Sequence, residues 1–215
     1  SLLTVQVDLF NQELLSEIEN IKFKYFNETD FKKVKTYRNK LNELFNQIYD
    51  GVNNFDYNIN FSEIVKKGGF DIILSNPPYK RIQWYENKYK NKLIKENFKT
   101  FESTGDIYAL FVEKSIKLLK ANGIFGFIVS NKWMKNKYGK SLRDFIIENT
   151  KISYFINFKG EKIFKSAAVD TCIVILRNVT PDNNIIRYSE NLSQEFINFK
   201  QSDLHKNRFN FYDNA

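Results

Sequence analysis

The feature that most constrains this chain is a short apolar run that stops at two consecutive prolines. Residues 70–74 read Phe-Asp-Ile-Ile-Leu, a run that is typical of a buried central strand in a parallel sheet. Asn76 follows, and then Pro77 and Pro78 fix two φ angles and remove two N–H groups, so the strand cannot continue. Because ligands of open α/β sheets bind where parallel strands end, we expect this loop to be functional.

The loop has the chemistry to handle an amino group on a flat ring. Asn76 offers a side-chain carbonyl, and Pro77 offers a backbone carbonyl without an N–H beside it. Two acceptors can hold both hydrogens of an exocyclic NH2 and aim its lone pair at an electrophile, while Tyr79 can stack on the ring. A neutral amine that attacks a sulfonium methyl loses its proton afterwards, so no strong base is needed. The alternative interpretation is an ordinary proline turn after a strand.

The same loop resembles a known catalytic motif. Residues 76–79 resemble the Asn-Pro-Pro-Tyr motif of S-adenosylmethionine-dependent amino methyltransferases. Residues 56–65 and 68–71 are similar to the segment that precedes this motif in adenine-N6 DNA methyltransferases of combined restriction-modification enzymes, such as type IIG. The resemblance covers about residues 8–180 and implies S-adenosylmethionine as cofactor. The catalytic residues that it implies are Asn76, Pro77, Pro78 and Tyr79.

Composition and charge narrow the class of partner. The net charge of +8 and the isoelectric point near 9.3 favour a polyanion such as nucleic acid, although an anionic membrane surface fits equally. No apolar run approaches the roughly 20 residues that span a bilayer, so we expect no membrane association by a spanning helix. The single cysteine, Cys172, suits a reducing, cytoplasmic location. The single histidine, His205, excludes a histidine-rich metal site, and we expect no metal.

The N-terminal part reads as helical. Apolar residues recur at helical spacing in 8–20 and in 29–50, with Thr29 or Asp30 as a plausible N-cap and Gly51 as a plausible stop. The basic residues of the second helix spread around it, which favours a solvated face over a DNA contact. No linker separates these helices from the rest, so residues 1–60 are predicted to be a helical elaboration of one domain.

Residues 80–99 change in character after the proline loop. They interleave basic residues with Trp84, Tyr85, Tyr89 and Phe98. This pattern is typical of a nucleic-acid-facing flap, with charge for phosphates and rings for bases, but an irregular loop and helix with ordinary surface lysines fits as well. We assign DNA contacts to Lys80 and Arg81, which follow the loop directly.

A βαβ unit is predicted next. Residues 105–108, Gly-Asp-Ile-Tyr, open a helix with Asp106 as a fair N-cap, and Asn122 with Gly123 is predicted to end it. Residues 124–129 are a second buried strand, parallel to the first. The resemblance extends to residues 105–108 and implies a cofactor-binding set of Asn76, Pro77 and Asp106, at the methionine end of the cofactor.

The following elements complete a partial sheet. Residues 138–149 are predicted to be a helix, and residues 152–158 and 170–176 an antiparallel pair of strands. The predicted fold is therefore α/β, the C-terminal half of a Rossmann-like methyltransferase sheet with its antiparallel hairpin, plus N-terminal helices. The resemblance assigns residues 61–180 to the catalytic half of a methyltransferase.

The loop between these two strands contains Phe164, flanked by lysines. The resemblance implies that Phe164 stacks on the flipped base together with Tyr79. The alternative is that Phe164 folds back onto the core. Phosphate contacts are predicted for Lys162 and Lys165, and for Lys132, which follows the second parallel strand.

Two parts of the family pattern have no counterpart in this sequence. Upstream of Asn76 no strand-like run is followed by a Gly-x-Gly turn, which this fold needs to hold the cofactor. Residues 181–215 hold one further short strand at 185–188 and read as the start of a linker to a target-recognition domain. We therefore expect an incomplete S-adenosylmethionine pocket and a segment that is inactive alone, with the cofactor half and the recognition domain elsewhere in the same polypeptide.

The leading interpretation is methyl transfer from S-adenosylmethionine to the N6 amino group of adenine in double-stranded DNA, with the base flipped out of the helix. The alternatives are methylation of a glutamine side chain in a protein, which can use the same tetrapeptide, and a DNA-binding module without catalysis. A second stacking ring at Phe164 and the basic flap argue against the glutamine substrate, because a glutamine needs neither.

Overall fold

The structure, a computed structural model, describes residues 9–49, 55–160, 163–164, 170–207, 209 and 211. The chain divides into two compact units, Ser1–Gly68 and Gly69–Ala215. The division falls eight residues after the predicted boundary at 60, and residues 181–215 lie in the same unit as the loop at 76–79. The functional roles assigned to the three predicted segments stay predictions.

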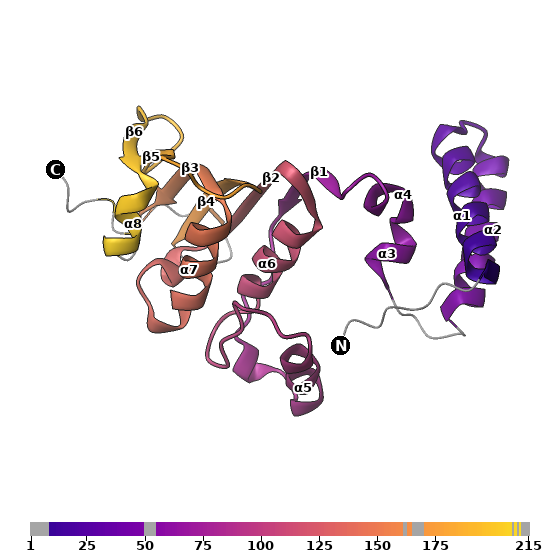
Figure 1. Cartoon of the computed structure of the whole chain (residues 1–215), viewed down its shortest axis with the longest axis horizontal. Helices are drawn as coiled ribbons and strands as arrows, with labels where there is room; N and C mark the ends of the chain where they lie inside the picture. Colours follow the sequence, from indigo (N-terminus) through magenta and orange to yellow (C-terminus); the bar gives the residue numbers. More distant parts are fainter. Residues whose placement is uncertain are drawn as a thin grey trace. The chain divides into compact units, whose positions relative to one another are not determined.

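The first unit is helical, as predicted. Helices α1 (Leu9–Asn27) and α2 (Phe31–Tyr49) pack through a small core of Leu14, Ile18 and Leu44 (Figure 1). The carboxylate of Asp30 accepts hydrogen bonds from the first backbone N–H groups of α2, at 2.9 and 3.0 Å, which confirms it as the N-cap. The predicted stop at Gly51 lies outside the described residues. Two short helices follow, α3 (Tyr57–Asn60) and α4 (Ser62–Val65).

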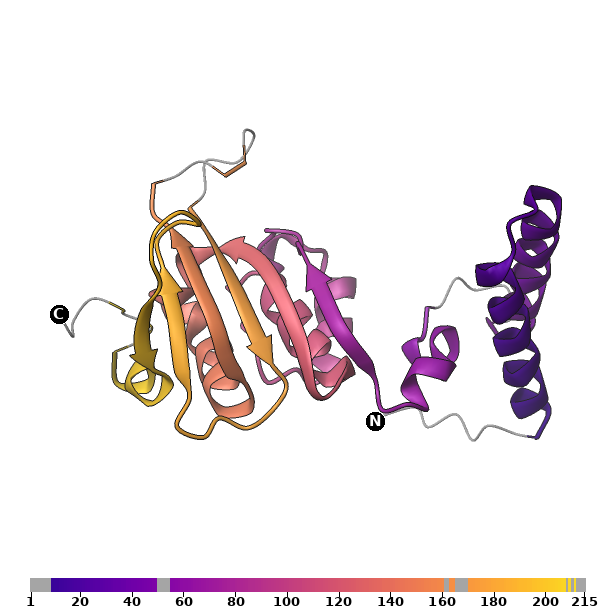
Figure 2. The ribbon, with the colours of Figure 1, turned by 90° about the horizontal axis from the view of Figure 1, so that it is seen from above.

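The second unit is built on a six-stranded mixed sheet (Figure 2). Its strands are β1 (Phe70–Ser75), β2 (Leu119–Ser130), β3 (Lys151–Phe158), β4 (Thr171–Arg177), β5 (Ile185–Ser189) and β6 (Ile197–Lys200). The order in the sheet is β1-β2-β4-β3-β5-β6. Strand β2 pairs parallel with β1 and antiparallel with β4, which in turn pairs antiparallel with β3. The predicted parallel pair and the predicted antiparallel hairpin are both confirmed.

The position of β1 differs from the prediction of a buried central strand. β1 is the edge strand of the described sheet, and Ile72 and Leu74 are 61% and 78% exposed. The apolar run was read correctly as a strand, but no strand in the described part of the chain pairs with its free side. The side chains that a second neighbour or a covering layer would bury are therefore exposed.

Helices α6 (Tyr108–Leu118) and α7 (Lys140–Asn149) cover one face of the sheet, and the buried residues of α7 include Leu142, Phe145 and Ile146, as predicted (Figure 2). Two predictions for α6 were wrong. The helix ends at Leu118 rather than at Asn122, because Leu119 is already extended and opens β2. Its N-cap position is Ile107, without a side-chain cap, so Asp106 does not cap it.

The C-terminal part contributes more structure than its sequence predicted. The short strand at 185–188 is confirmed as β5, but β6 and helix α8 (Gln201–Asn207) were not predicted. Phe209 and Phe211 are buried in the main core, where the Phe211 ring stacks on Tyr188 with centroids 4.3 Å apart. In the described residues, no helix is long and apolar enough to cross a membrane.

Candidate active site at the carboxyl ends of the parallel strands

Strands β1, β2 and β3 run in the same direction, because β4, between β2 and β3, is antiparallel to both of those neighbours. Their carboxyl ends therefore meet at one edge of the sheet. Three segments with predicted site residues leave the sheet at this edge, as can be followed in Figure 2. They are the loop at 76–79 after β1, the turn from Asn131 after β2, and the connection 159–170 after β3.

The loop at 76–79 is fixed by Tyr79 and presents Asn76. Tyr79 is half-buried, and its phenol donates a hydrogen bond to the carbonyl of Ile128 on β2, with an O···O distance of 3.1 Å. Burial raises the pKa of this phenol, so it stays neutral and remains a donor. Pro77 is buried, whereas Asn76 is exposed and its amide makes no hydrogen bond within the described part of the chain. The arrangement leaves the side-chain carbonyl oxygen and the NH2 group of Asn76 available to a ligand.

The start of α6 lies directly beside this loop. The backbone N–H of Ile107 donates to the carbonyl of Lys80 at 2.9 Å, and the N–H of Ile82 donates to the carbonyl of Gly105 at 2.8 Å. Between these bonds, the backbones of Arg81 and Asp106 pair in an isolated antiparallel β-bridge. The structure therefore brings Asp106 next to the loop at 76–79, although the two are about 30 residues apart in sequence.

Two tyrosines that the sequence did not single out surround Asp106. Burial raises the pKa of the phenols of Tyr108 and Tyr138, and the nearby Asp106 carboxylate raises both further. Both hydroxyls are buried within reach of the Asp106 carboxylate, although neither makes a hydrogen bond of ordinary geometry in the described part of the chain. The Arg81 guanidinium lies over the Tyr138 ring, 5.8 Å from its centroid. Tyr138 was read only as the start of a helix, and nothing in its sequence neighbourhood indicated this position.

The turn after β2 is held from two sides. Asn131 donates from its side-chain amide to Asn157 at 2.8 Å, and its backbone N–H donates to the carbonyl of Asp170 at 3.0 Å. Buried Arg143 stabilises the turn at 131–139, because its guanidinium donates hydrogen bonds to the backbone carbonyls of Trp133 and Asn136. Lys132 is exposed on this turn, at the predicted edge.

The turn tolerates only glycine at position 139. A Cβ atom at Gly139 would lie 2.1 Å from the carbonyl oxygen of Trp133, a distance that no side chain can occupy. The close approach of two backbone segments therefore shapes the turn that presents Lys132.

The connection 159–170 is described only in part. Ile163 is 37% exposed and Phe164 is half-buried. Lys162 and Lys165, the two predicted phosphate contacts, lie outside the described residues. The direction of β3 places Lys159 and Gly160, which follow this strand, at the same edge as Asn76, but base stacking by Phe164 stays a prediction.

A shallow pocket of about 270 Å³ lies between α7 and the segment that precedes α6. Its lining residues are Lys99, Glu102, Lys140, Ser141, Asp144, Phe145 and Glu148. None of the predicted site residues lines it, so it is separate from the edge described above.

Comparison with known proteins finds similarity to restriction-modification methyltransferases. Residues 3–164 match the model of the family described as Eco57I restriction-modification methylase. The chain is 35% identical over 125 residues to the type II restriction enzyme and methyltransferase RM.Eco57I of Escherichia coli, covering 53% of this chain and 12% of that protein. It is 28% identical over 174 residues to the type II methyltransferase M.AccI of Acinetobacter calcoaceticus, covering 79% of this chain and 30% of that protein.

A solved structure with a similar fold is the methyltransferase subunit of a type I restriction-modification system from Streptococcus thermophilus. The TM-score is 0.51 at 15% identity, over 66% of this chain and 37% of that one. At this identity the likeness concerns the fold alone, and it confirms the predicted methyltransferase fold class. The chain spans less than a third of the length of either sequence relative.

Proposed function

Because the chain belongs to the Eco57I restriction-modification methylase family, we propose that it is the catalytic segment of an enzyme that methylates the N6 amino group of adenine in double-stranded DNA. S-adenosylmethionine is the cofactor of this fold and, when bound, supplies an electrophilic methyl group on its sulfonium. The whole enzyme would be a restriction-modification methyltransferase, with its cofactor half and its recognition domain in other parts of the polypeptide. The single cysteine of this chain, Cys172, is fully buried and forms no disulfide, in keeping with a cytoplasmic enzyme.

One observation carries this proposal. Asn76 is exposed at the end of β1, with its side-chain amide unengaged, while the next three residues are fixed by two prolines and the Tyr79 hydrogen bond. A rigid loop with free acceptors is what an exocyclic amino group needs, because preorganised acceptors cost no reorganisation during the reaction. The Asn76 and Pro77 carbonyls would accept the two amino hydrogens and direct the nitrogen lone pair.

The residues at this edge also fit the amino-acid end of S-adenosylmethionine. The hydroxyls of Tyr108 and Tyr138 are buried close to the carboxylate of Asp106, and neither makes a hydrogen bond of ordinary geometry in the described part of the chain. Such a cluster of polar groups can receive the ammonium and carboxylate of an amino acid, since buried polar groups need hydrogen bonds. Asp106, Asn76 and Pro77 would hold that end. In residues 9–49 and 55–69, the described elements are helices, so no residue there is assigned to the adenosine.

The target base would be held between rings. Tyr79 and Phe164 would stack on the flipped adenine, because base-flipping enzymes replace lost base stacking with aromatic contacts. Lys80, Arg81, Lys132, Lys162 and Lys165 would contact the DNA phosphates around it. After transfer, the methylated amine loses its extra proton to water, so none of these residues needs to act as a strong base.

The test is methyl transfer by an enzyme that contains this segment. Labelled methyl groups from S-adenosylmethionine are followed into DNA, and the modified nucleoside is identified after digestion. Asn76→Ala should lower the transfer rate by about a hundredfold or more and leave DNA affinity nearly unchanged, because the lost acceptor acts in the transition state. Asn198→Ala on β6, at the opposite edge of the sheet, serves as the control.

Two results would contradict the proposal. An Asn76→Ala enzyme that transfers methyl groups as fast as its parent would remove Asn76 from the mechanism. Label in a glutamine-containing peptide, but not in DNA, would assign the same loop to a protein substrate.

A further inference from the structure

The segment of residues 80–99, here called the arm, leaves the catalytic loop and returns before α6. It is tied down at both ends. Ile82 is 1% exposed at the first end. At the other end, Thr100 is buried and donates from its backbone N–H and its hydroxyl to the carboxylate of Glu113, at 2.8 and 3.0 Å. Between these anchors, helix α5 (Asn87–Lys95) has no buried residue and lies away from the sheet (Figure 1).

One face of α5 is a stripe of like charges. Lys88, Lys92 and Lys95 are spaced four and three residues apart, which places them on one side of a helix. All three are exposed, and among the described residues none of them forms an ion pair. Half-buried Leu93 lies on the opposite side. Neighbouring like charges destabilise an isolated helix, so this stripe favours a negatively charged partner.

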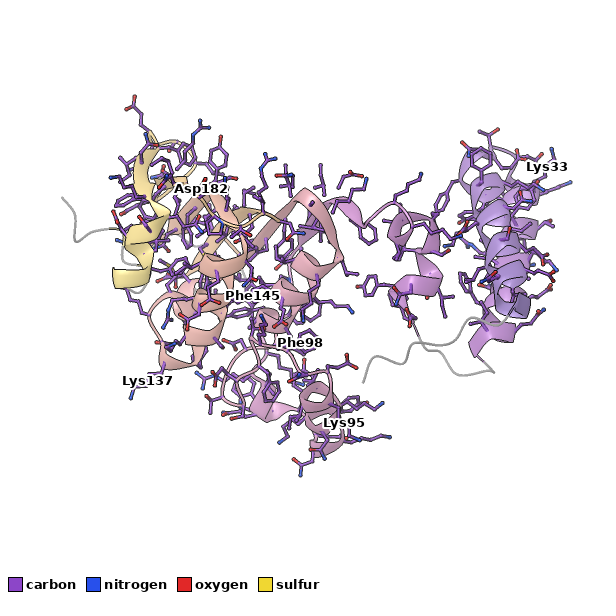
Figure 3. The ribbon with its side chains drawn as sticks, in the orientation of Figure 1. Lys33, Lys95, Phe98, Lys137, Phe145 and Asp182 are labelled. Carbon is purple, nitrogen blue, oxygen red and sulfur yellow. The ribbon has the colours of Figure 1, made fainter. Side chains whose placement is uncertain are left out.

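The outer and inner sides of the arm differ. Figure 3 labels Lys95 on α5, on the outer part of the arm, and Phe98 between α5 and α6. The ammonium of Lys117 on α6 lies 5.6 Å from the Phe98 ring centroid, so the inner side of the arm is held against α6. The lysine stripe is therefore presented outward from an anchored base.

The arm also exposes large apolar side chains. Trp84 is 64% exposed, Tyr89 53% and Ile94 56%. Lys80 lies over the ring of Tyr85, 4.2 Å from its centroid. Exposed rings among unpaired lysines are the composition of a nucleic-acid surface, in which charge follows the backbone and rings contact the bases.

The chain path places the arm on the side of the candidate active site. It is inserted between the carboxyl end of β1 and the start of α6, and therefore begins at the same edge as Asn76. Trp84 is five residues from Tyr79 and lies in a short 3-10 turn (Ile82–Trp84) that Ile82 anchors. A ligand at Asn76 that extends as far as a DNA duplex would meet this segment.

We propose that the arm is a DNA-binding element, in which Lys88, Lys92 and Lys95 contact phosphates beside the target base and Trp84 contacts bases. The proposal rests on DNA being the substrate of the candidate active site. The charge of the arm supports DNA over a neutral partner: residues 80–99 hold seven basic and two acidic residues.

The lysine stripe is tested by the salt dependence of DNA binding. Anisotropy of a labelled duplex is titrated with the chain at several salt concentrations, for the parent and for the triple variant K88Q, K92Q, K95Q. Each phosphate contact contributes about 0.9 to the slope of log K against log salt, so the variant should lose about 2 to 3 units of slope and at least tenfold in affinity. Glutamine is a good helix former, so α5 should persist, which circular dichroism checks.

A matched control removes the same charge elsewhere. The triple variant K32Q, K33Q, K35Q changes three lysines of α2 and should keep most of the affinity and slope of the parent. Equal losses in the two triple variants would show a general charge effect and would overturn the proposal. Absence of DNA binding by the parent, or binding of polyglutamate in preference to DNA, would overturn it as well.

Trp84 gives an independent readout. The chain has two tryptophans, and Trp133 is fully buried, so a change of emission on adding DNA reports mainly on Trp84. We expect DNA to quench the emission of the parent and to leave that of Trp84→Phe unchanged. Equal quenching in both would show that Trp84 makes no contact.

The two proposals can fail separately. Both binding measurements are made without cofactor or methyl transfer. If the arm variants weaken DNA binding while the intact enzyme methylates a peptide, the arm assignment stands and the adenine assignment fails. If the intact enzyme methylates adenine in DNA and the arm triple variant binds DNA as the parent does, the adenine assignment stands and the arm assignment fails.

Discussion

At the scale of single residues, Asn76 and Tyr79 have complementary roles in the same loop. The hydroxyl of Tyr79 donates a hydrogen bond to the backbone of β2, and its ring packs edge-to-face on Tyr108, with ring centroids 6.4 Å apart. Asn76 keeps its amide free. Because Tyr79 holds the loop in place, the loop does not have to become ordered on binding, and the unengaged amide of Asn76 can hold a ligand in one geometry.

The first prediction at this scale concerns Phe164. In an enzyme that contains this segment, Phe164→Ala should weaken retention of the flipped base by about 1–3 kcal/mol, the usual contribution of one base–aromatic stack. A fluorescent base analogue at the target position reports the flipped state. Ile163→Ala is the matched control on the neighbouring side chain. An unchanged flipping signal in the Phe164 variant would support the alternative, in which Phe164 packs on the core.

At the scale of secondary-structure elements, a buried carboxylate on α6, that of Glu113, holds Thr100, the residue that follows the arm. The side chain of Glu113 is fully buried, accepts two hydrogen bonds from Thr100 and forms an ion pair with Lys117 at 2.5 Å. Burial by itself raises the pKa of this carboxyl, but the hydrogen bonds from Lys117 and Thr100 outweigh it and hold the pKa below its usual 4.5. Glu113 is therefore charged in the folded chain.

This depressed pKa predicts a pH dependence of stability. A carboxyl whose pKa is lower in the folded state stabilises the fold fully above its unfolded pKa, near 4.5, and loses that contribution as the pH falls through the folded value. Glu113→Gln should therefore lower the free energy of unfolding at pH 7 by about 2 kcal/mol, as for a hydrogen bond to a charged group. The difference between parent and variant should shrink below pH 4.5.

Denaturant unfolding, followed by the emission of buried Trp133, measures this difference at each pH. Glu148→Gln, an exposed carboxylate on α7, is the control and should change stability little at any pH. A constant difference between parent and Glu113→Gln from pH 7 to pH 3 would contradict the assigned linkage.

At the scale of the whole molecule, the sheet unit has a large core but an open edge. Its core extends from α6 and β2 to Phe209 and Phe211, so it has the buried apolar surface that an independent fold requires. In the described part of the chain, the free side of β1 has no partner strand, and Ile72 and Leu74 are exposed, which leaves an edge that can pair with a further strand.

The prediction at this scale concerns the 215-residue chain by itself. We expect it to fold and yet not to bind S-adenosylmethionine at micromolar concentration, because the contacts that we propose for Asn76, Pro77 and Asp106 reach the amino-acid end of the cofactor alone. Calorimetric titration of the purified chain measures this directly, with thermal unfolding as the check that it is folded. Saturable micromolar binding would reveal a pocket for the adenosine end that the sequence and the described residues do not indicate.

Local patterns were enough to predict the strands and the loop of the candidate site. The apolar runs at 70–74 and 170–176, the prolines at 77–78 and the alternation in 152–158 are short patterns, and each predicted its strand or loop correctly. The likeness of residues 76–79 to a catalytic motif likewise lies within one stretch of chain. Such features can be predicted because neighbouring residues alone decide them.

Contacts between residues that are distant in the sequence became known only from the folded structure. Asp106 meets Arg81, Tyr138 reaches the same cluster, and Phe211 packs on Tyr188, all through contacts between distant segments. The edge position of β1 is of the same kind, because a strand is central or peripheral according to its neighbours and not to its own residues. Pairing and burial depend on the whole chain, and for that physical reason the cluster around Asp106 could not be read from the sequence.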